Sequence, residues 1–120
     1  MNDGYQYNYS ESIESVESMY HREVRIKKAK KTIAVITDYY GNISNLSLLD
    51  IGSSTGIMTN EYSKFFKKVI GIDLDYKAIN FANKNFKNEN LKFITSPIEE
   101  SNFGDSSFDV ITCSHIYEHV

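Results

Sequence analysis

Two glycines and two aspartates have the residue types and the spacing that a nucleoside site requires. Asp50 ends a short apolar run and is followed by Gly52 and Gly56. A second apolar run, further along the chain, ends at Asp73. Glycines let the backbone turn sharply and approach a ligand closely, and a helix that begins after such a loop offers free N–H groups to a carboxylate or phosphate. A carboxylate at Asp73 can accept hydrogen bonds from both hydroxyls of a ribose.

The loop departs from the two common phosphate-binding patterns. A dinucleotide fingerprint requires glycines at the positions of Gly52, Ser54 and Ile57, and only the first of these is a glycine. A P-loop is excluded because no Gly-Lys-Ser/Thr follows. Asp50 would repel a diphosphate, whereas it would attract an ammonium or a sulfonium. The residues therefore favour a nucleoside with a cationic amino-acid tail, and a nicotinamide dinucleotide stays open as an alternative.

The elements that must position these residues are short strands that alternate with helices. Four apolar runs have the length of strands, namely residues 46–51, 69–73, 91–95 and 108–113. A helix is predicted over residues 22–40, with Gly41 ending it, and two more follow the first and second strands. This order predicts an α/β fold, a Rossmann-like, doubly wound parallel sheet covered on both faces. Ligands of such sheets bind beyond the carboxyl ends of the strands.

Apolar residues at helical spacing define the inner faces of the three predicted helices. These faces consist, in order, of Ala29, Ile33, Ile36 and Tyr40; of Met58, Tyr62, Phe65 and Phe66; and of Ile79, Ala82 and Phe86. Asp75 is placed to cap the third helix. The first helix also carries a basic stretch formed by Arg22, Arg25, Lys27, Lys28, Lys30 and Lys31. We interpret this stretch as a solvated helix face, with a phosphorylated substrate or an RNA backbone as the alternative.

The composition is that of one small globular domain. The chain has 120 residues, of which 41% are hydrophobic and 24% charged. Its net charge of −3 argues against a generic nucleic-acid binder. The single cysteine, Cys113, excludes an internal disulfide framework, fits a reducing, cytoplasmic compartment and is predicted to pack within a strand. No apolar run approaches the ~20 residues that a membrane span needs.

Four segments together resemble a known family. They read LLDIGSSTG at residues 48–56, VIGIDLD at 69–75, FGDSSFDVI at 103–111 and YEHV at 117–120. In this order and spacing they resemble the class I S-adenosylmethionine-dependent methyltransferases of the type 11 kind. The resemblance implies that residues 21–120 are the N-terminal cofactor-binding half of such a domain. Residues 1–20 would then be a polar, tyrosine-rich extension, partly helical.

The resemblance implies S-adenosyl-L-methionine as the cofactor. The cofactor-binding residues that it implies are Asp50, Gly52, Ser54, Gly56, Asp73, Leu74, Ile98 and Ser114. The glycine loop with Asp50 would shape the pocket for the methionine moiety, and Asp73 would bind the ribose. Leu74 and Ile98 would contact the two sides of the adenine, and Ser114 would lie near the sulfonium. Pro97 stands where many members have an acid that binds the adenine amino group, so that contact must come from another group.

No catalytic base is identified by the sequence. Methyl transfer by direct displacement can gain much of its rate from holding the reacting atoms in line, so that a base is not obligatory. His115 and His119 are the candidate proton acceptors near the site. Together with Glu118 they would share a helix face with metal-ligand spacing. We prefer the interpretation that these residues merely begin a helix, so that no metal is predicted.

The resemblance further implies that relatives continue beyond a fourth strand, whereas this chain ends at Val120. We therefore expect a sheet truncated after its fourth strand, with uncovered apolar surface that favours a partner chain or self-association. The main hypothesis is a methyltransferase that acts on a small-molecule acceptor, without a membrane partner. The alternative is a truncated, non-catalytic remnant or interaction module that binds the cofactor weakly or needs a partner chain.

Overall fold

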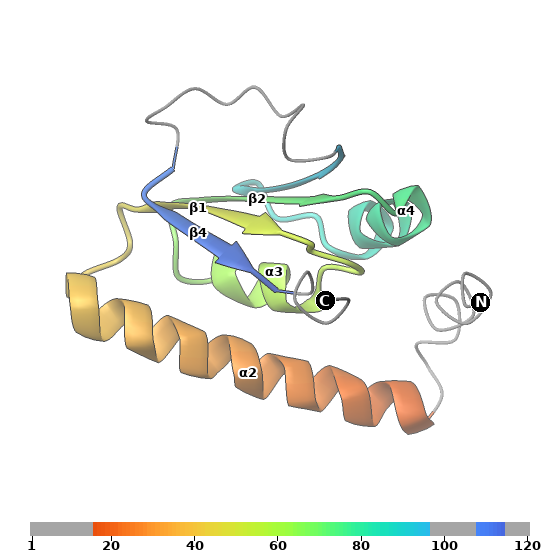
Figure 1. Cartoon of the computed structure of the whole chain (residues 1–120), viewed down its shortest axis with the longest axis horizontal. Coiled ribbons are helices and arrows are strands. Elements are labelled where there is room, and N and C mark those ends of the chain that lie inside the picture. Colours follow the sequence, from red (N-terminus) through yellow and green to blue (C-terminus); the bar gives the residue numbers. More distant parts are fainter. Residues whose placement is uncertain (1–15, 97–107, 115–120) are drawn as a thin grey trace.

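The described part of the chain forms a parallel sheet with a layer of helices against it (Figure 1). The computed structural model describes residues 16–96 and 108–114. Its elements are α2 (Val16–Tyr40), β1 (Ser47–Ile51), α3 (Ile57–Ser63), β2 (Lys68–Asp73), α4 (Tyr76–Asn85), β3 (Leu91–Thr95) and β4 (Val110–Cys113). The strand order is β3-β2-β1-β4, and every neighbouring pair is parallel. The predicted α/β fold with a Rossmann-like parallel sheet is confirmed.

The strand register brings the chemically unusual residues to one edge of the sheet. Asp50 of β1 lies opposite Gly71 of β2 and Thr112 of β4. Asp73 ends β2 beside Thr95 of β3. Because the strands are parallel, their carboxyl ends meet at this edge, which is where ligands of such sheets bind.

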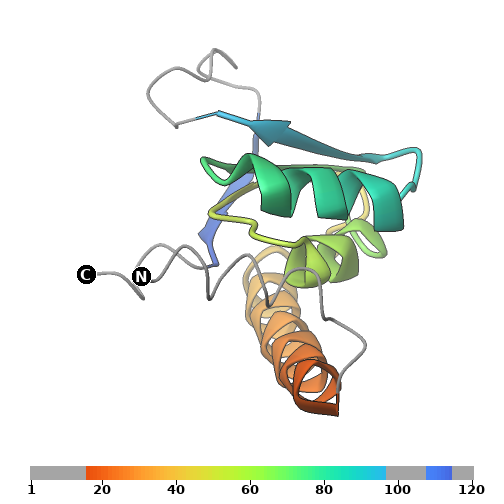
Figure 2. The same ribbon diagram turned by 90° about the vertical axis from the view of Figure 1, so that its right-hand side faces the viewer.

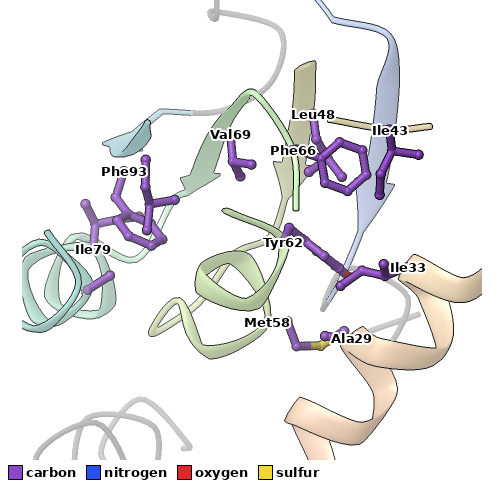
Figure 3. Close-up of a cluster of buried hydrophobic side chains, with 12 residues drawn as sticks. Ala29, Ile33, Ile43, Leu48, Met58, Tyr62, Phe66, Val69, Ile79 and Phe93 are labelled. Atoms are coloured by element: carbon purple, nitrogen blue, oxygen red, sulfur yellow. The ribbon is translucent and has the colours of Figure 1, made fainter. Parts of the chain in front are cut away.

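One face of the sheet carries all three described helices (Figure 2). Leu48 of β1 and Val69 of β2 point toward this layer and pack with Tyr62 of α3 (Figure 3). Ala29 and Ile33 of α2 belong to the same cluster. The opposite face carries a smaller cluster of Leu49, Ile51, Ile70 and Ile72, with Phe108 packed against it. The second helix layer that a doubly wound sheet requires is not among the elements that the structure describes.

The predicted helix ends are confirmed by their hydrogen bonds. The Asp75 carboxylate accepts from the backbone N–H groups of Lys77 and Ala78, at 3.0 and 3.3 Å, and so caps α4. Gly41 adopts a left-handed φ of 83° after the last turn of α2, and its N–H donates to the Thr37 carbonyl.

Although α2 has 25 residues, no helix in the described ranges is apolar enough to cross a membrane.

Several details of the predicted elements are wrong. The first helix begins at Val16 rather than residue 22, and the last strand begins at Val110 rather than 108. Phe65 is 46% exposed, because α3 ends at Ser63 and the chain turns away before that side chain can join the inner face. Tyr40, at the end of α2, is 45% exposed. Cys113 is exposed rather than packed, because side chains of β4 alternate and this one lies on the face opposite the helices.

Gly56 and Gly41 make a matched pair, since both have left-handed backbones. Gly56 has φ 91° and Gly41 has φ 83°. A Cβ atom on Gly56 would come within 2.6 Å of Phe93 Cζ and 3.0 Å of Ala82 Cβ, whereas one on Gly41 would meet nothing within 4 Å. The loop after β1 therefore needs glycine at residue 56 for space as well as for conformation.

We expect Gly56→Ala to destabilise the chain more than Gly41→Ala. Each substitution costs about 1–2 kcal/mol for a left-handed alanine, and Gly56→Ala adds roughly 1–3 kcal/mol for overpacking against Phe93. Urea unfolding followed by circular dichroism measures both losses. Equal losses for the two variants would show that the packing around Gly56 is not a constraint.

Candidate functional site

The loop between β1 and α3 folds back over the end of β2. The N–H groups of Gly52 and Ser53 both donate to the Ile72 carbonyl, at 2.9 and 3.0 Å. Ser54 has a φ of 53°, the left-handed conformation that glycine adopts most readily. Its N–H donates to Asp73 Oδ2 at 2.7 Å, which holds a serine in this conformation. The loop and the end of β2 thus form one hydrogen-bonded unit.

Asp73 is fixed by two backbone hydrogen bonds. Besides Ser54 N–H on Oδ2, it accepts the Asp75 N–H on Oδ1 at 2.9 Å. A carboxylate has about four lone-pair positions, so that acceptor capacity remains for a ligand. The side chain is half-buried, and the neighbouring Leu74 is 71% exposed. A fixed hydrogen-bond acceptor therefore stands beside an apolar side chain at the open edge of the sheet.

Asp50 is fully buried and bonds to hydroxyls from two other elements. Thr59 of α3 donates to Oδ2 at 2.6 Å. Thr112 and Ser114, at the end of β4, donate to Oδ1 at 2.8 and 2.6 Å. A carboxylate with 0% exposure needs such donors to be stable inside a protein. The resemblance implies that Asp50 shapes the methionine pocket. Because Asp50 is buried, it would do so through the side chains of Thr112 and Ser114.

A hollow of about 210 Å³ lies where α2 and α3 meet the end of β4. It is lined by Lys28, Thr32, Met58, Tyr62, Thr112, Cys113 and Ser114. Met58 and Tyr62 reach from α3 toward α2 (Figure 3), so that an apolar and an aromatic side chain line the hollow together with the polar residues. The hollow is large enough for a small polar ligand group, and polar atoms border it from both α2 and β4.

The structure brings most of the implied cofactor residues to the same edge of the sheet. Asp50 and Asp73 stand at the ends of adjacent strands, with Gly52, Ser54 and Gly56 in the loop between β1 and α3. Leu74 follows Asp73, and Ser114 follows β4, where its N–H donates to the Ile51 carbonyl. The predictions for Ile98, Pro97, His115, Glu118 and His119 lie outside the described residues. Within residues 16–96 and 108–114, no cluster of His, Cys, Asp and Glu is arranged to hold a metal.

Sequence reasoning missed the hydroxyl partners of Asp50 and the wall of the hollow on α2. Thr59 and Thr112 look ordinary in the sequence. Thr112 could have been found only by aligning the strands, since it is the β4 residue opposite Asp50. Lys28 was interpreted as part of a solvated basic stretch, yet it also lines the hollow.

Comparisons with known proteins agree with this geometry. The family model described as a methyltransferase domain matches residues 49–120, more than half of the chain. A ubiquinone biosynthesis O-methyltransferase of Rickettsia felis is 32% identical over 90 residues, covering 73% of this chain and 36% of the relative. The corresponding protein of Acinetobacter baylyi is 27% identical over 89 residues, covering 71% and 37%.

Solved structures show the same fold. The Bacillus subtilis protein YcgJ superposes with a TM-score of 0.57 at 26% identity, over 70% of this chain and 37% of that one. The amino pentose methyltransferase CalS10 of Micromonospora echinaspora gives a TM-score of 0.66 at 20% identity, over 81% and 40%.

The parallel sheet, the glycine loop and the matched family model define a class I S-adenosylmethionine-dependent methyltransferase fold. The chain belongs to the methyltransferase domain family. It spans a little over a third of the length of the two ubiquinone-pathway relatives named above.

Tyr62 lines the hollow, and the pKa of its phenol is shifted by its surroundings. Burial and the negative charge of Asp50 raise the pKa of Tyr62 from 10.0 to about 12, and hydrogen bonds with Ser114 and Thr32 lower it in part. The phenol therefore stays neutral in the folded chain at a pH where an unfolded tyrosine ionises.

This shift predicts an alkaline loss of stability that depends on Tyr62. Between about pH 9 and pH 11 the unfolded tyrosine releases its proton while the folded one keeps it, so that the free energy of unfolding falls by roughly 1 kcal/mol. The Tyr62→Phe variant should lack this component. Urea unfolding at both pH values measures it, with the exposed Tyr39→Phe as control. If Tyr62→Phe loses as much stability as the parent over this range, the account of Tyr62 is wrong.

Proposed function

We propose that the chain carries the cofactor-binding part of an enzyme that transfers a methyl group from S-adenosyl-L-methionine to a small-molecule acceptor. The observation that carries the proposal is the Asp73 carboxylate, held by the N–H groups of Ser54 and Asp75 at the carboxyl end of β2. A carboxylate fixed in this way is ready to accept two ribose hydroxyls without reorganising, which favours binding.

The residues around Asp73 fit a nucleoside. Exposed Leu74 offers an apolar surface on which a base can pack. The left-handed backbones of Gly52, Ser54 and Gly56 let the loop come close to a ligand at the end of β1. With the base beside Leu74, the rest of the ligand extends across β1 toward β4.

The β4 side fits the amino-acid tail. The hollow near Ser114 lies in front of the buried Asp50 carboxylate, which attracts positive charge. A diphosphate, the other ligand class considered for such a loop, would be repelled there. The fit of these residues therefore favours an aminoacyl nucleoside over a dinucleotide.

The chemistry that S-adenosylmethionine supplies when bound is an electrophilic methyl group on a sulfonium. The residues of this chain contribute binding and orientation: Asp73 holds the ribose, and the glycine loop sets how closely the ligand approaches the sheet. Holding the methyl group in line with an acceptor accounts for much of the rate of such a displacement. His115 and His119 stay the candidate proton acceptors.

Small-molecule acceptors are supported by the similar proteins. The names of the relatives and of CalS10 refer to ubiquinone biosynthesis and to an amino pentose. The acceptor of this chain is proposed to be of the same general size, without a membrane partner or a nucleic acid. The negative charge of the chain supports the last point.

We expect Asp73→Asn to weaken S-adenosylmethionine binding by at least tenfold, because it removes the charge that strengthens the ribose hydrogen bonds. Calorimetric titration of the purified chain measures the affinity. Asp109→Asn is the matched control, since Asp109 also accepts a backbone N–H, from Ser47 at 2.9 Å, but lies at the opposite edge of the sheet. The control should bind like the parent.

Two results would contradict the proposal. One is a folded parent chain that does not bind S-adenosylmethionine. The other is Asp73→Asn binding as tightly as the parent, which would remove Asp73 from the ribose site. Tighter binding of a nicotinamide dinucleotide than of S-adenosylmethionine would favour the dinucleotide alternative.

A further inference from the structure

The phenol of Tyr62 lies between α2 and the end of β4. Its side chain reaches from α3 toward α2 (Figure 3) and is 1% exposed. Hydrogen bonds join it to Thr32 of α2 and to Ser114, which follows β4. All three residues line the hollow. Because a buried O–H group needs an acceptor, a ligand that enters the hollow has to leave the phenol with one.

Both partners of the phenol direct their own hydrogens elsewhere. Thr32 Oγ1 donates to the Lys28 carbonyl, one turn earlier in α2, at 3.1 Å. Ser114 Oγ donates to Asp50 Oδ1 at 2.6 Å. Each hydroxyl therefore meets the phenol with a lone pair, and Tyr62 has a single hydrogen to donate. That hydrogen has two acceptors, one on α2 and one at the end of β4.

A ligand at the β4 side of the hollow changes the balance between the two acceptors. A ligand group that donates to Ser114 Oγ brings a second positive hydrogen to that oxygen, which repels the phenolic hydrogen. Thr32 Oγ1 then becomes the better acceptor for Tyr62. Without this second acceptor, the phenol would be left buried and unpaired, and that cost would be subtracted from the binding of the ligand.

We propose that Tyr62 couples α2 to the ligand: when S-adenosylmethionine occupies the hollow, the phenolic O–H turns from Ser114 to Thr32. The inference rests on the proposed function. Tyr62 is then a positioning residue, which acts through Ser114 and ties α2 to the domain most firmly in the ligand-bound state. Because such coupling is reciprocal, the acceptor that Thr32 provides also favours binding of the ligand.

A second tyrosine provides a matched control. Tyr40, at the end of α2, donates its O–H to the Asp109 carbonyl at 3.3 Å. This bond lies beside Ser47 at the start of β1, at the edge of the sheet opposite the hollow. Tyr40 is 45% exposed, so that water can replace its partner. A ligand in the hollow has no reason to change this bond.

The test is a double-mutant cycle on the affinity for S-adenosylmethionine, measured by calorimetric titration. We expect Thr32→Val to weaken binding by roughly fivefold or more, because the ligand then leaves a buried phenol without an acceptor. In a chain that already carries Tyr62→Phe, the same substitution should change the affinity by less than about twofold, since no phenol remains to be paired. Tyr40→Phe should bind like the parent and should leave the effect of Thr32→Val undiminished.

A purely structural role of Thr32 would weaken binding equally with and without the phenol. That result, or an unchanged affinity in Thr32→Val, would overturn the inference while leaving the proposed function intact. If Tyr62→Phe does not fold, amide hydrogen exchange decides. Saturating ligand should slow exchange in α2 around Thr32 in the parent but not in Thr32→Val, and equal exchange in the parent with and without ligand overturns the inference. A folded parent chain that does not bind S-adenosylmethionine overturns both the inference and the proposed function.

Discussion

The buried carboxylate of Asp50 is the interaction on which the rest of the site depends. It stands in the central part of the sheet, on β1, and binds hydroxyls of α3 and of the β4 end. Removing one of these hydroxyls would take a donor away from a fully buried carboxylate, which is costly. The network therefore fixes where the glycine loop leaves β1 and where Ser114 ends β4, and those two positions frame the hollow.

A second carboxylate organises the neighbouring strand in a different way. Asp73 is half-buried and accepts backbone N–H groups of the loop and of the segment after β2. The donors of Asp50 are thus hydroxyls inside the protein, whereas Asp73 is partly exposed and keeps acceptor capacity for the proposed ligand. The two positions look alike in the sequence, since each is an aspartate near the end of an apolar run. The two aspartates differ in burial, since Asp50 is fully buried and Asp73 is half-buried.

The sequence correctly predicted features that depend on residues close together in the chain. The Asp75 cap, the Gly41 helix end and the β3 strand follow from residue types with strong local preferences. Phe65 and Cys113 were assigned wrongly, because helical spacing does not reveal that α3 ends at Ser63, and an apolar run does not reveal which face of a strand is covered. The partners of Asp50 come from segments distant in the chain, so that only the strand register shows them.

The central claim is that the loop after β1, the end of β2 and the end of β4 bind one aminoacyl nucleoside. Amide NMR spectra of the ¹⁵N-labelled chain during titration with S-adenosylhomocysteine test it most directly. The account predicts saturable shifts at Gly52, Ser54, Leu74 and Ser114, with little change at Asp109 on the opposite edge. A folded chain whose spectrum does not respond, or whose shifts gather away from these residues, would contradict it.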